Sequence, residues 1–189
     1  MTTQLQIFLQ KNTLLFQNEI SDIFSFFKFE KVKRNERLIE FGNICKHIFF
    51  INSGCSKIYG LDKKGNEITS KFSFEDHIIT TLTSFIDQKP SRDCLIAIEN
   101  SEILKIDRAT FFKLIDKYPA LKDFYKNLLE FAFIHSQMRV YGFLKMEGID
   151  KLTWVIEHEP KLLSRTSSKS VASYLGMTNS TLSKLKAKL

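Results

Sequence analysis

The chain has 189 residues, 43% of them hydrophobic and 18 of them phenylalanine, which is enough apolar surface for one large core or two modest ones. No stretch approaches the roughly 18 uninterrupted apolar residues of a membrane-spanning helix. The three cysteines form no Cys-x-x-Cys pair, and no leader-like segment opens the chain. These features argue against membrane-embedded and disulfide-stabilised classes, and we expect a cytoplasmic protein without contact to a membrane.

The positive charge is concentrated toward the C-terminal end. The net charge is +7, from 28 basic and 21 acidic residues, and six of the basic residues follow Glu159 with no acidic residue among them. They are Lys161, Arg165, Lys169, Lys184, Lys186 and Lys188. Such asymmetry indicates a polyanionic partner, most simply nucleic acid. A solvated tail is the alternative, but this segment keeps apolar residues at helical spacing: Val171, Leu175, Leu182, Leu185 and Leu189.

The first thirty residues predict two short helices, because their apolar residues recur at helical intervals. From about Phe29 the pattern changes to short β-branched and aromatic segments, separated by turn residues that include Gly42, Gly54 and Gly65. Short strands at regular spacing are typical of an antiparallel barrel or sandwich. We expect strands at residues 37–41, 47–51, 56–61, 67–72, 94–98 and 103–106, and the β-rich block to end near Asp107.

A long helix follows the β-rich block. Asp107 is suited to cap a helix that reaches Lys117, and Pro119 is suited to the first turn of the next helix, which we expect to run to about Lys145. Apolar residues in this helix alternate at spacings of three and four, which is typical of a coiled-coil seam and predicts a homodimer. Alternatively, part of the stripe covers the β-rich domain. The candidate seam residues are Leu121, Phe124, Leu128, Phe131, His135 and Met138.

The C-terminal end has the pattern of a helix-turn-helix unit. Gly142 and Gly148 bracket a joint, and the helix after the joint is closed by Pro160. Ser167 is suited to cap a helix over 168–175, Gly176 to the turn, and Thr178 to cap a final helix. The pattern therefore predicts two short helices joined by a tight turn.

The outward face of the final helix carries the candidates for DNA contact. Asn179 and Lys184 are suited to pair with base edges, whereas Lys169 and Lys188 flank the motif and are suited to phosphate. Polar helix starts are also common in ordinary helices, so a second interpretation stays open: a ligand-binding signalling module whose C-terminal helices dock another protein. The complete set of DNA-binding candidates is Asn179, Ser180, Ser183, Lys184, Lys169 and Lys188.

Over nearly its whole length the chain resembles transcription regulators of the Crp/Fnr family. The segment ERLIEFGNICKHIFFINSGCSKIYGLDKKGNEITSKF is similar to the family's cyclic-nucleotide-binding-type β-roll, in which Gly54 ends an I-x-x-G motif and Gly65 and Glu67 belong to the hairpin turn. SVASYLGMTNSTLSKLK resembles the family's helix-turn-helix, with Ala172 closely packed and Leu182 as the anchor of the recognition helix. The short chain and apolar β-roll look most like the compact members from Bacteroidetes-type bacteria.

The resemblance implies an α+β fold with an N-terminal antiparallel β-roll, which is a cyclic-nucleotide-binding-like double-stranded β-helix with flanking helices. A long dimerisation helix and a C-terminal helix-turn-helix domain follow. We expect a sensor domain at 1–118, the dimerisation helix and hinge at 119–146, and the DNA-binding domain at 147–189. The implied function is that of a homodimeric transcription regulator, not an enzyme, that binds a palindromic operator in double-stranded DNA. RNA polymerase and a small-molecule effector are further implied partners.

The effector pocket departs from the family pattern. Members that bind cyclic AMP have a Gly-Glu pair that opens a short helix and an Arg-Ser pair after it. Here Thr80 or Thr81 takes the place of Glu, and Arg92 comes one position late, with Ser91 in the expected place. Because a strand alternates its faces, Arg92 is predicted to point away from the pocket, and we do not expect cyclic AMP as the effector. Two alternatives stay open: the cavity holds another ligand, or hydrophobic side chains fill it. The candidate pocket residues are Thr80, Thr81, Ser91, Arg92 and Ser136.

The sequence indicates no metal site and no cofactor. Its histidines are scattered without metal-ligand spacing, and the cysteine cluster of the family's iron–sulfur sensors is missing. His77 beside Glu75 and Asp76 is suited to a metal, but the same triplet is also typical of an exposed turn.

Overall fold

The computed structural model describes residues 3–188. The chain opens with the two predicted helices, α1 (Gln4–Asn12) and α2 (Gln17–Ser25). Thr3 caps α1 in a reciprocal capping box with Gln6, which satisfies two backbone N–H groups at the start of the helix. The apolar faces of both helices are buried in the core of the β-domain through Leu5, Leu9, Ile20 and Ile23.

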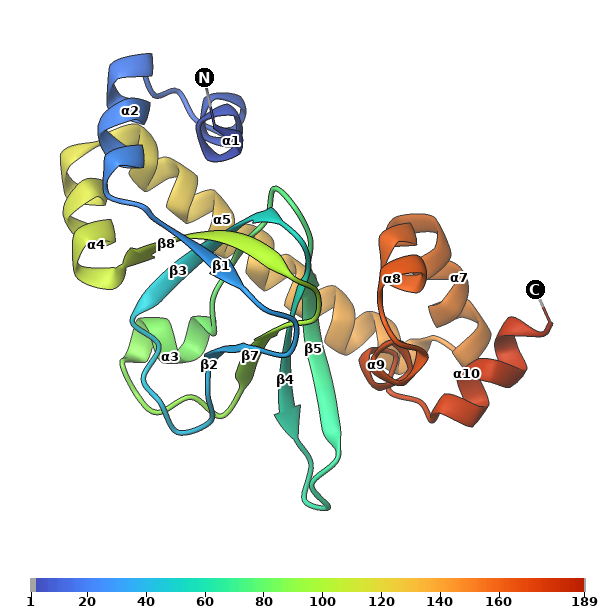
Figure 1. Ribbon diagram of the computed structural model, residues 1–189. Coiled ribbons are helices and arrows are strands. Elements are labelled where there is room, and N and C mark those ends of the chain that lie inside the picture. The colour runs from blue at the N-terminus through green and yellow to red at the C-terminus, as the bar shows by residue number, and fades with distance from the viewer. Residues whose placement is uncertain (1–2, 189) are drawn as a thin grey trace. The chain divides into compact units, whose positions relative to one another are not determined.

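The β-domain is an antiparallel β-roll made of two four-stranded sheets (Figure 1). The first sheet has the order β1 (Lys28–Val32), β8 (Ser101–Asp107), β3 (His47–Ser53) and β6 (Ile78–Ile79). The second has the order β2 (Arg37–Ile39), β7 (Cys94–Ala97), β4 (Ser56–Leu61) and β5 (Glu67–Ser73). In the β3–β8 ladder Ile48 pairs with Ile106 and Phe50 with Leu104, and the register shifts after Ile51. All of these apolar side chains are buried, so the ladder forms the centre of the core.

The predicted strands are confirmed, with ends that differ by at most two residues. The sequence prediction missed β1, β6 and the short helix α3 (Leu82–Asp87). β1 gives little pattern because only Val32 of its five residues is buried, and Phe29 is exposed. β6 has two residues, and α3 has no side-chain cap, so neither has a local signal that distinguishes it from a loop.

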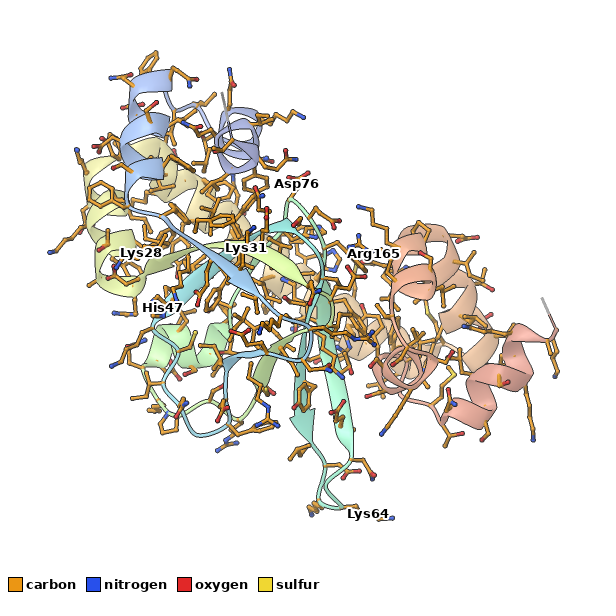
Figure 2. All side chains as sticks on the ribbon, in the orientation of Figure 1. Lys28, Lys31, His47, Lys64, Asp76 and Arg165 are labelled. Carbon is orange, nitrogen blue, oxygen red and sulfur yellow. The ribbon has the colours of Figure 1, made fainter. Side chains whose placement is uncertain are left out.

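Two glycines hold the tight geometry of the roll. Gly54 has φ +97°, and a Cβ atom at this position would lie 2.8 Å from the Cα atom of Ser101. Gly65 has φ +81° in the β4–β5 turn, where Asp62 Oδ1 accepts hydrogen bonds from the backbone N–H groups of Lys64 and Asn66, both at 2.8 Å. Figure 2 shows Lys64 at the tip of this hairpin. The turn predicted from the residues Asp62 to Gly65 is therefore confirmed.

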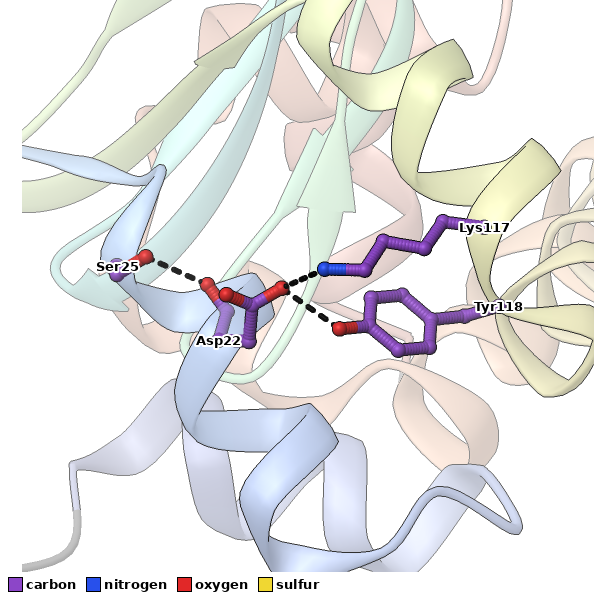
Figure 3. A network of polar contacts seen from close by, with 4 residues as sticks. All are labelled: Asp22, Ser25, Lys117 and Tyr118. Atoms are coloured by element: carbon purple, nitrogen blue, oxygen red, sulfur yellow. Dashed lines mark hydrogen bonds and ion pairs between the residues drawn. The ribbon is translucent and has the colours of Figure 1, made fainter.

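Helix α4 (Arg108–Lys117) starts at the predicted cap, since the Asp107 side chain accepts a hydrogen bond from Thr110 N. Its C-terminal end is tied to α2, as Figure 3 shows. Asp22 Oδ2 accepts from Lys117 Nζ at 2.8 Å and from the Tyr118 hydroxyl at 2.6 Å. These hydrogen bonds lower the pKa of Asp22, the one from Lys117 contributing most.

The long helix is divided into three parts. α5 (Pro119–Gln137) is followed by a π-helix at Met138–Gly142 and by one further turn, α6 (Phe143–Lys145). The predicted boundary near Lys145 is confirmed, but the sequence did not indicate the π-helix. The first turns of α5 cover the β-roll, because Leu121 and Phe124 are only 2% and 9% exposed.

Four helices complete the chain: α7 (Gly148–His158), α8 (Pro160–Arg165), α9 (Ser168–Tyr174) and α10 (Asn179–Lys186). Pro160 ends α7 as predicted, but it also begins α8, a helix that the sequence prediction missed. The chain divides into two compact units. One comprises the residues up to Ile58 together with Ser73–Glu130, and the other comprises Tyr59–Phe72 and the residues from Phe131 onward.

Within residues 3–188, no helix has the length and apolar character needed to cross a membrane. The same residues contain no group of three or more His, Cys, Asp or Glu side chains arranged to hold a metal ion.

Candidate nucleic-acid interface

Helices α9 and α10 form a compact pair joined by a tight turn. Each helix begins at its predicted cap: Ser167 Oγ accepts from Ser170 N at 3.2 Å, and Thr178 Oγ1 accepts from Thr181 N at 3.1 Å. Such caps satisfy backbone N–H groups that a helix start leaves without partners. The local sequence therefore determines where both helices start.

Gly176 makes the turn possible. Its φ is +67°, a conformation that costs a residue with a side chain about 1–2 kcal/mol. The turn is a Schellman motif, in which Met177 N donates to Ala172 O at 3.0 Å and Gly176 N to Ser173 O at 3.1 Å. The chain reverses sharply enough for α10 to pack on the preceding helices.

The two helices share a small core with α7. Val171, Leu175 and Leu182 are at most 1% exposed. The close approach of α7 and α10 depends on Gly148, because a Cβ atom there would lie 3.0 Å from Leu185 Cδ1. Leu189, the last residue of the predicted apolar stripe, lies outside the described residues.

Burial of Leu182 directs the other faces of α10 to solvent. All six residues proposed for DNA contact are exposed. They are Lys169, Asn179, Ser180, Ser183, Lys184 and Lys188. No acidic residue follows Glu159, so the charged residues of α9 and α10 are all basic. Short polar side chains lie at the N-terminal turn of α10 and are suited to approach the edges of base pairs.

The proposed effector residues do not all share one environment. Thr81 and Ser91 are buried in the β-roll, Thr80 is half-buried, and Arg92 is exposed. Ser136, on α5, is also exposed. The Ser91 hydroxyl already donates to Asp93 O at 2.7 Å, and the Thr80 hydroxyl to His47 O at 2.9 Å. The exposed Arg92 side chain is therefore not enclosed in the β-roll with Thr81 and Ser91.

The β-roll also buries hydroxyl groups that have no hydrogen-bond partner among residues 3–188. The Oγ atoms of Ser56 and Ser73 and the Oγ1 atom of Thr81 are in this state, and each residue is at most 3% exposed. An unpaired buried hydroxyl is unfavourable, with a cost of about 1–3 kcal/mol. These groups are therefore suited to a polar partner inside the domain. The sequence indicated only Thr81 among them.

The predicted dimer seam needs a correction at its N-terminal end. Leu121 and Phe124 belong to the core of their own chain, where Phe124 contacts Phe8 with ring centroids 5.9 Å apart, so neither can meet a second copy. Leu128 is half-buried, and the exposed part of the predicted seam begins at Phe131 and includes His135 and Met138. Leu121 and Phe124 are buried because part of the apolar stripe covers the β-domain, which was the alternative interpretation of the sequence.

A second apolar stripe begins near the end of α5. Phe131, Ile134, Met138 and Tyr141 are 57%, 55%, 54% and 59% exposed, and they follow one another at spacings of three, four and three residues. Ile134 and Tyr141 were not among the predicted seam residues, although their spacing was visible in the sequence. Such a large exposed apolar stripe on a helix is unusual for a surface that stays in water.

Comparisons with known proteins agree with this architecture. Residues 29–118 match the protein family described as the cyclic nucleotide-binding domain. The solved structure of FixK2 from Bradyrhizobium japonicum has a TM-score of 0.76 at 14% identity, covering 86% of this chain and 84% of that chain. The c-di-GMP-responsive global regulator CLP from Xanthomonas campestris has a TM-score of 0.74 at 13% identity, covering 90% of each chain.

A third solved structure, the catabolite activator protein of Thermus thermophilus, has a TM-score of 0.62 at 17% identity and covers 93% of this chain and 84% of that chain. A comparison with curated proteins gives no match. The identities are low, so these structures establish a shared fold. Residues 29–118 are thus similar to the cyclic nucleotide-binding domain family, and the chain shares the fold of these solved structures.

Proposed function

We propose that the protein is a homodimeric transcription regulator that binds a palindromic DNA site with helices α9 and α10, which we call the reading head. The observation that carries the proposal is the exposed outer face of α10, where Ser180 and Lys184 lie opposite the buried Leu182 and Asn179 is exposed in the first turn. The similar fold of solved transcription regulators supports the same conclusion.

The chemistry of this face suits duplex DNA. The amide of Asn179 can donate and accept at once, which matches the N6 and N7 groups of adenine in the major groove. Lys184 is exposed one turn beyond Ser180 on α10 and supplies a donor for guanine or phosphate. Lys169 and Lys188 flank these residues and supply charge for the phosphate backbone, which carries most of the affinity. The reading head therefore has groups for both recognition and positioning.

The stripe formed by Phe131, Ile134, Met138 and Tyr141 is the proposed dimer seam. Phe131 and Ile134 lie on α5, and Met138 and Tyr141 lie on the π-helix that follows it, so together they form an exposed apolar segment that a second copy of the same segment would cover. A dimer is also what a palindromic site requires, because its two half-sites are related by a twofold axis and lie about 34 Å apart. The seam and the reading head thus support one mode of action.

We assign to the β-roll the role of a sensor for a small polar effector other than cyclic AMP. The unpaired hydroxyls of Ser56, Ser73 and Thr81 give such an effector hydrogen-bonding partners. The exposed position of Arg92 argues against a cyclic nucleotide phosphate as the group recognised.

The test is selection of a binding site from a random duplex pool, followed by affinity measurements at several salt concentrations. Asn179→Ala should cost about 1–3 kcal/mol on the selected site and little on random duplex. Lys188→Ala should weaken both alike and lower the salt slope by about one unit. Lys113→Ala is the matched control, because Lys113 is an exposed lysine on α4, outside the proposed interface.

Failure to select any duplex would contradict the proposal and favour the second function, a signalling module whose C-terminal helices dock another protein. That function predicts binding with weak salt dependence and no preference among duplexes. A selected site whose affinity is the same for the Asn179→Ala, Lys188→Ala and unaltered proteins would place DNA contact elsewhere on the chain.

A further inference from the structure

Strand β5 lies at the edge of its sheet. Within residues 3–188 it is the last strand in the order β2-β7-β4-β5, so no further strand pairs with its outer side. An open edge of this kind is normally shielded or blocked by another element. Here the side chains of Ser173, on α9, and Arg139, on the π-helix, bind β5.

Ser173, on α9, binds this edge in both directions. Its hydroxyl donates to Glu67 O at 2.6 Å and accepts from Thr69 N at 2.8 Å. A single side chain thus satisfies one acceptor and one donor of the strand, two residues apart, as a neighbouring strand would. The hydrogen bonds connect the first helix of the reading head directly to β5.

Arg139 makes a second connection beside the first. Its guanidinium donates to Thr69 O at 2.7 Å and to Ser70 O. The same group lies over the ring of Tyr174, 4.7 Å from the centroid, and the ring centroid of Phe72 lies 5.5 Å from that of Tyr174. Arg139 is therefore bound to β5 and stacked on α9 at the same time.

The position of Arg139 depends on the π-helix. Arg139 is the second of the five residues of the π-helix Met138–Gly142. A π-helix changes the direction of the side chains that follow it, and such segments occur often at functional sites. Gly142 and the extended residue Met146 then lead to α7, so the covalent path from the long helix to the reading head passes through a short joint.

We propose that Ser173 and Arg139 are positioning residues that fix the reading head on the β4–β5 hairpin and thereby set the spacing of the two half-sites that the dimer recognises. This inference rests on the proposed function. Without these hydrogen bonds the joint and the ring contacts of Tyr174 with Phe72 and Phe143 remain, and the reading head can turn more freely to meet half-sites at several spacings. Holding it on a paired strand preorganises one orientation, which favours one spacing over the others.

The experiment measures the affinity of full-length variants for three duplexes: the selected site, the same site with two base pairs added between the half-sites, and a single half-site. Ser173→Ala and Arg139→Lys should reduce the preference for the selected spacing by about tenfold, or about 1.4 kcal/mol, and leave single half-site binding unchanged. Lysine keeps the charge but not the two-point geometry.

Two controls separate positioning from general damage. Ser173→Thr keeps the hydroxyl and should retain the preference of the unaltered protein. Ser164→Ala removes an exposed serine hydroxyl of α8 that donates to Lys161 O of the same helix at 3.2 Å, and it should not change the spacing preference. Hydrogen exchange gives a direct readout, since the Thr69 amide should exchange about tenfold faster in Ser173→Ala once its partner is lost.

The outcomes are distinguishable. If the unaltered protein selects a duplex and Ser173→Ala keeps its spacing preference, the positioning role is wrong and the proposed function stands. Tighter binding of Ser173→Ala at the selected spacing would also overturn the inference, because the contacts would then hold the head away from DNA. If the unaltered protein selects no duplex, the proposed function fails first and the inference with it.

Discussion

The sharpest structural prediction concerns Gly54, at the start of the second sheet. Gly54→Ala adds a Cβ atom that would lie 2.2 Å from Ser101 Oγ, 2.7 Å from Ser101 Cβ and 2.8 Å from Ser101 Cα. The Oγ atom can rotate away, but the Cα atom belongs to the backbone of β8. Relief of the collision therefore requires β8 and the residues around Gly54 to move apart.

The expected cost has two sources. A residue with a side chain at φ +97° loses about 1–2 kcal/mol through backbone strain. Overpacking against a buried strand adds about 1–3 kcal/mol. Gly54→Ala should therefore reduce the free energy of unfolding by about 2–5 kcal/mol.

Gly42→Ala is the matched control, because Gly42 has a similar φ of +80° but no atom within 4 Å of the added Cβ. Gly42→Ala should lose only the backbone-strain part of the free energy of unfolding, about 1–2 kcal/mol. Urea denaturation followed by far-ultraviolet circular dichroism gives both values. Equal losses for the two variants would refute the reasoning, since the contact with Ser101 would then contribute nothing.

Asp22→Asn should destabilise the protein at neutral pH and have no effect in strong acid. The pKa of Asp22 is lowered in the folded state, so the ionised carboxylate stabilises the fold above about pH 4, and this stabilisation is lost as the pH falls through the lowered pKa. Melting curves of both proteins across acid pH measure the difference. Leu182→Ala should cost about 2–5 kcal/mol in the free energy of unfolding measured with urea, whereas exposed Lys186→Ala should cost less than about 0.5 kcal/mol. Phe131→Asp should convert a dimer into a monomer by light scattering, and a monomeric unaltered protein would contradict the seam. Cyclic AMP at about millimolar concentration should leave the melting temperature unchanged, because binding to the native state would raise it.

The sequence by itself determined the features that depend on local chemistry. Asp107, Ser167 and Thr178 start their helices because a short polar side chain binds the backbone N–H groups a few residues later, whatever the rest of the fold does. Gly176 permits the left-handed turn for the same kind of reason. The outward face of α10 also followed from the sequence, since helical periodicity places Leu182 opposite Ser180 and Lys184.

Tertiary structure alone decided which of several apolar faces is covered. The periodicity of α5 is the same for a dimer seam and for a face packed on the β-roll. Contact with residues such as Phe8 shows that Phe124 packs on the β-roll. The bonds from Ser173 and Arg139 to β5 join residues 104 and 70 positions apart. Such contacts depend on how the strands pair and where the π-helix lies. The periodicity of the sequence does not indicate a partner so distant along the chain.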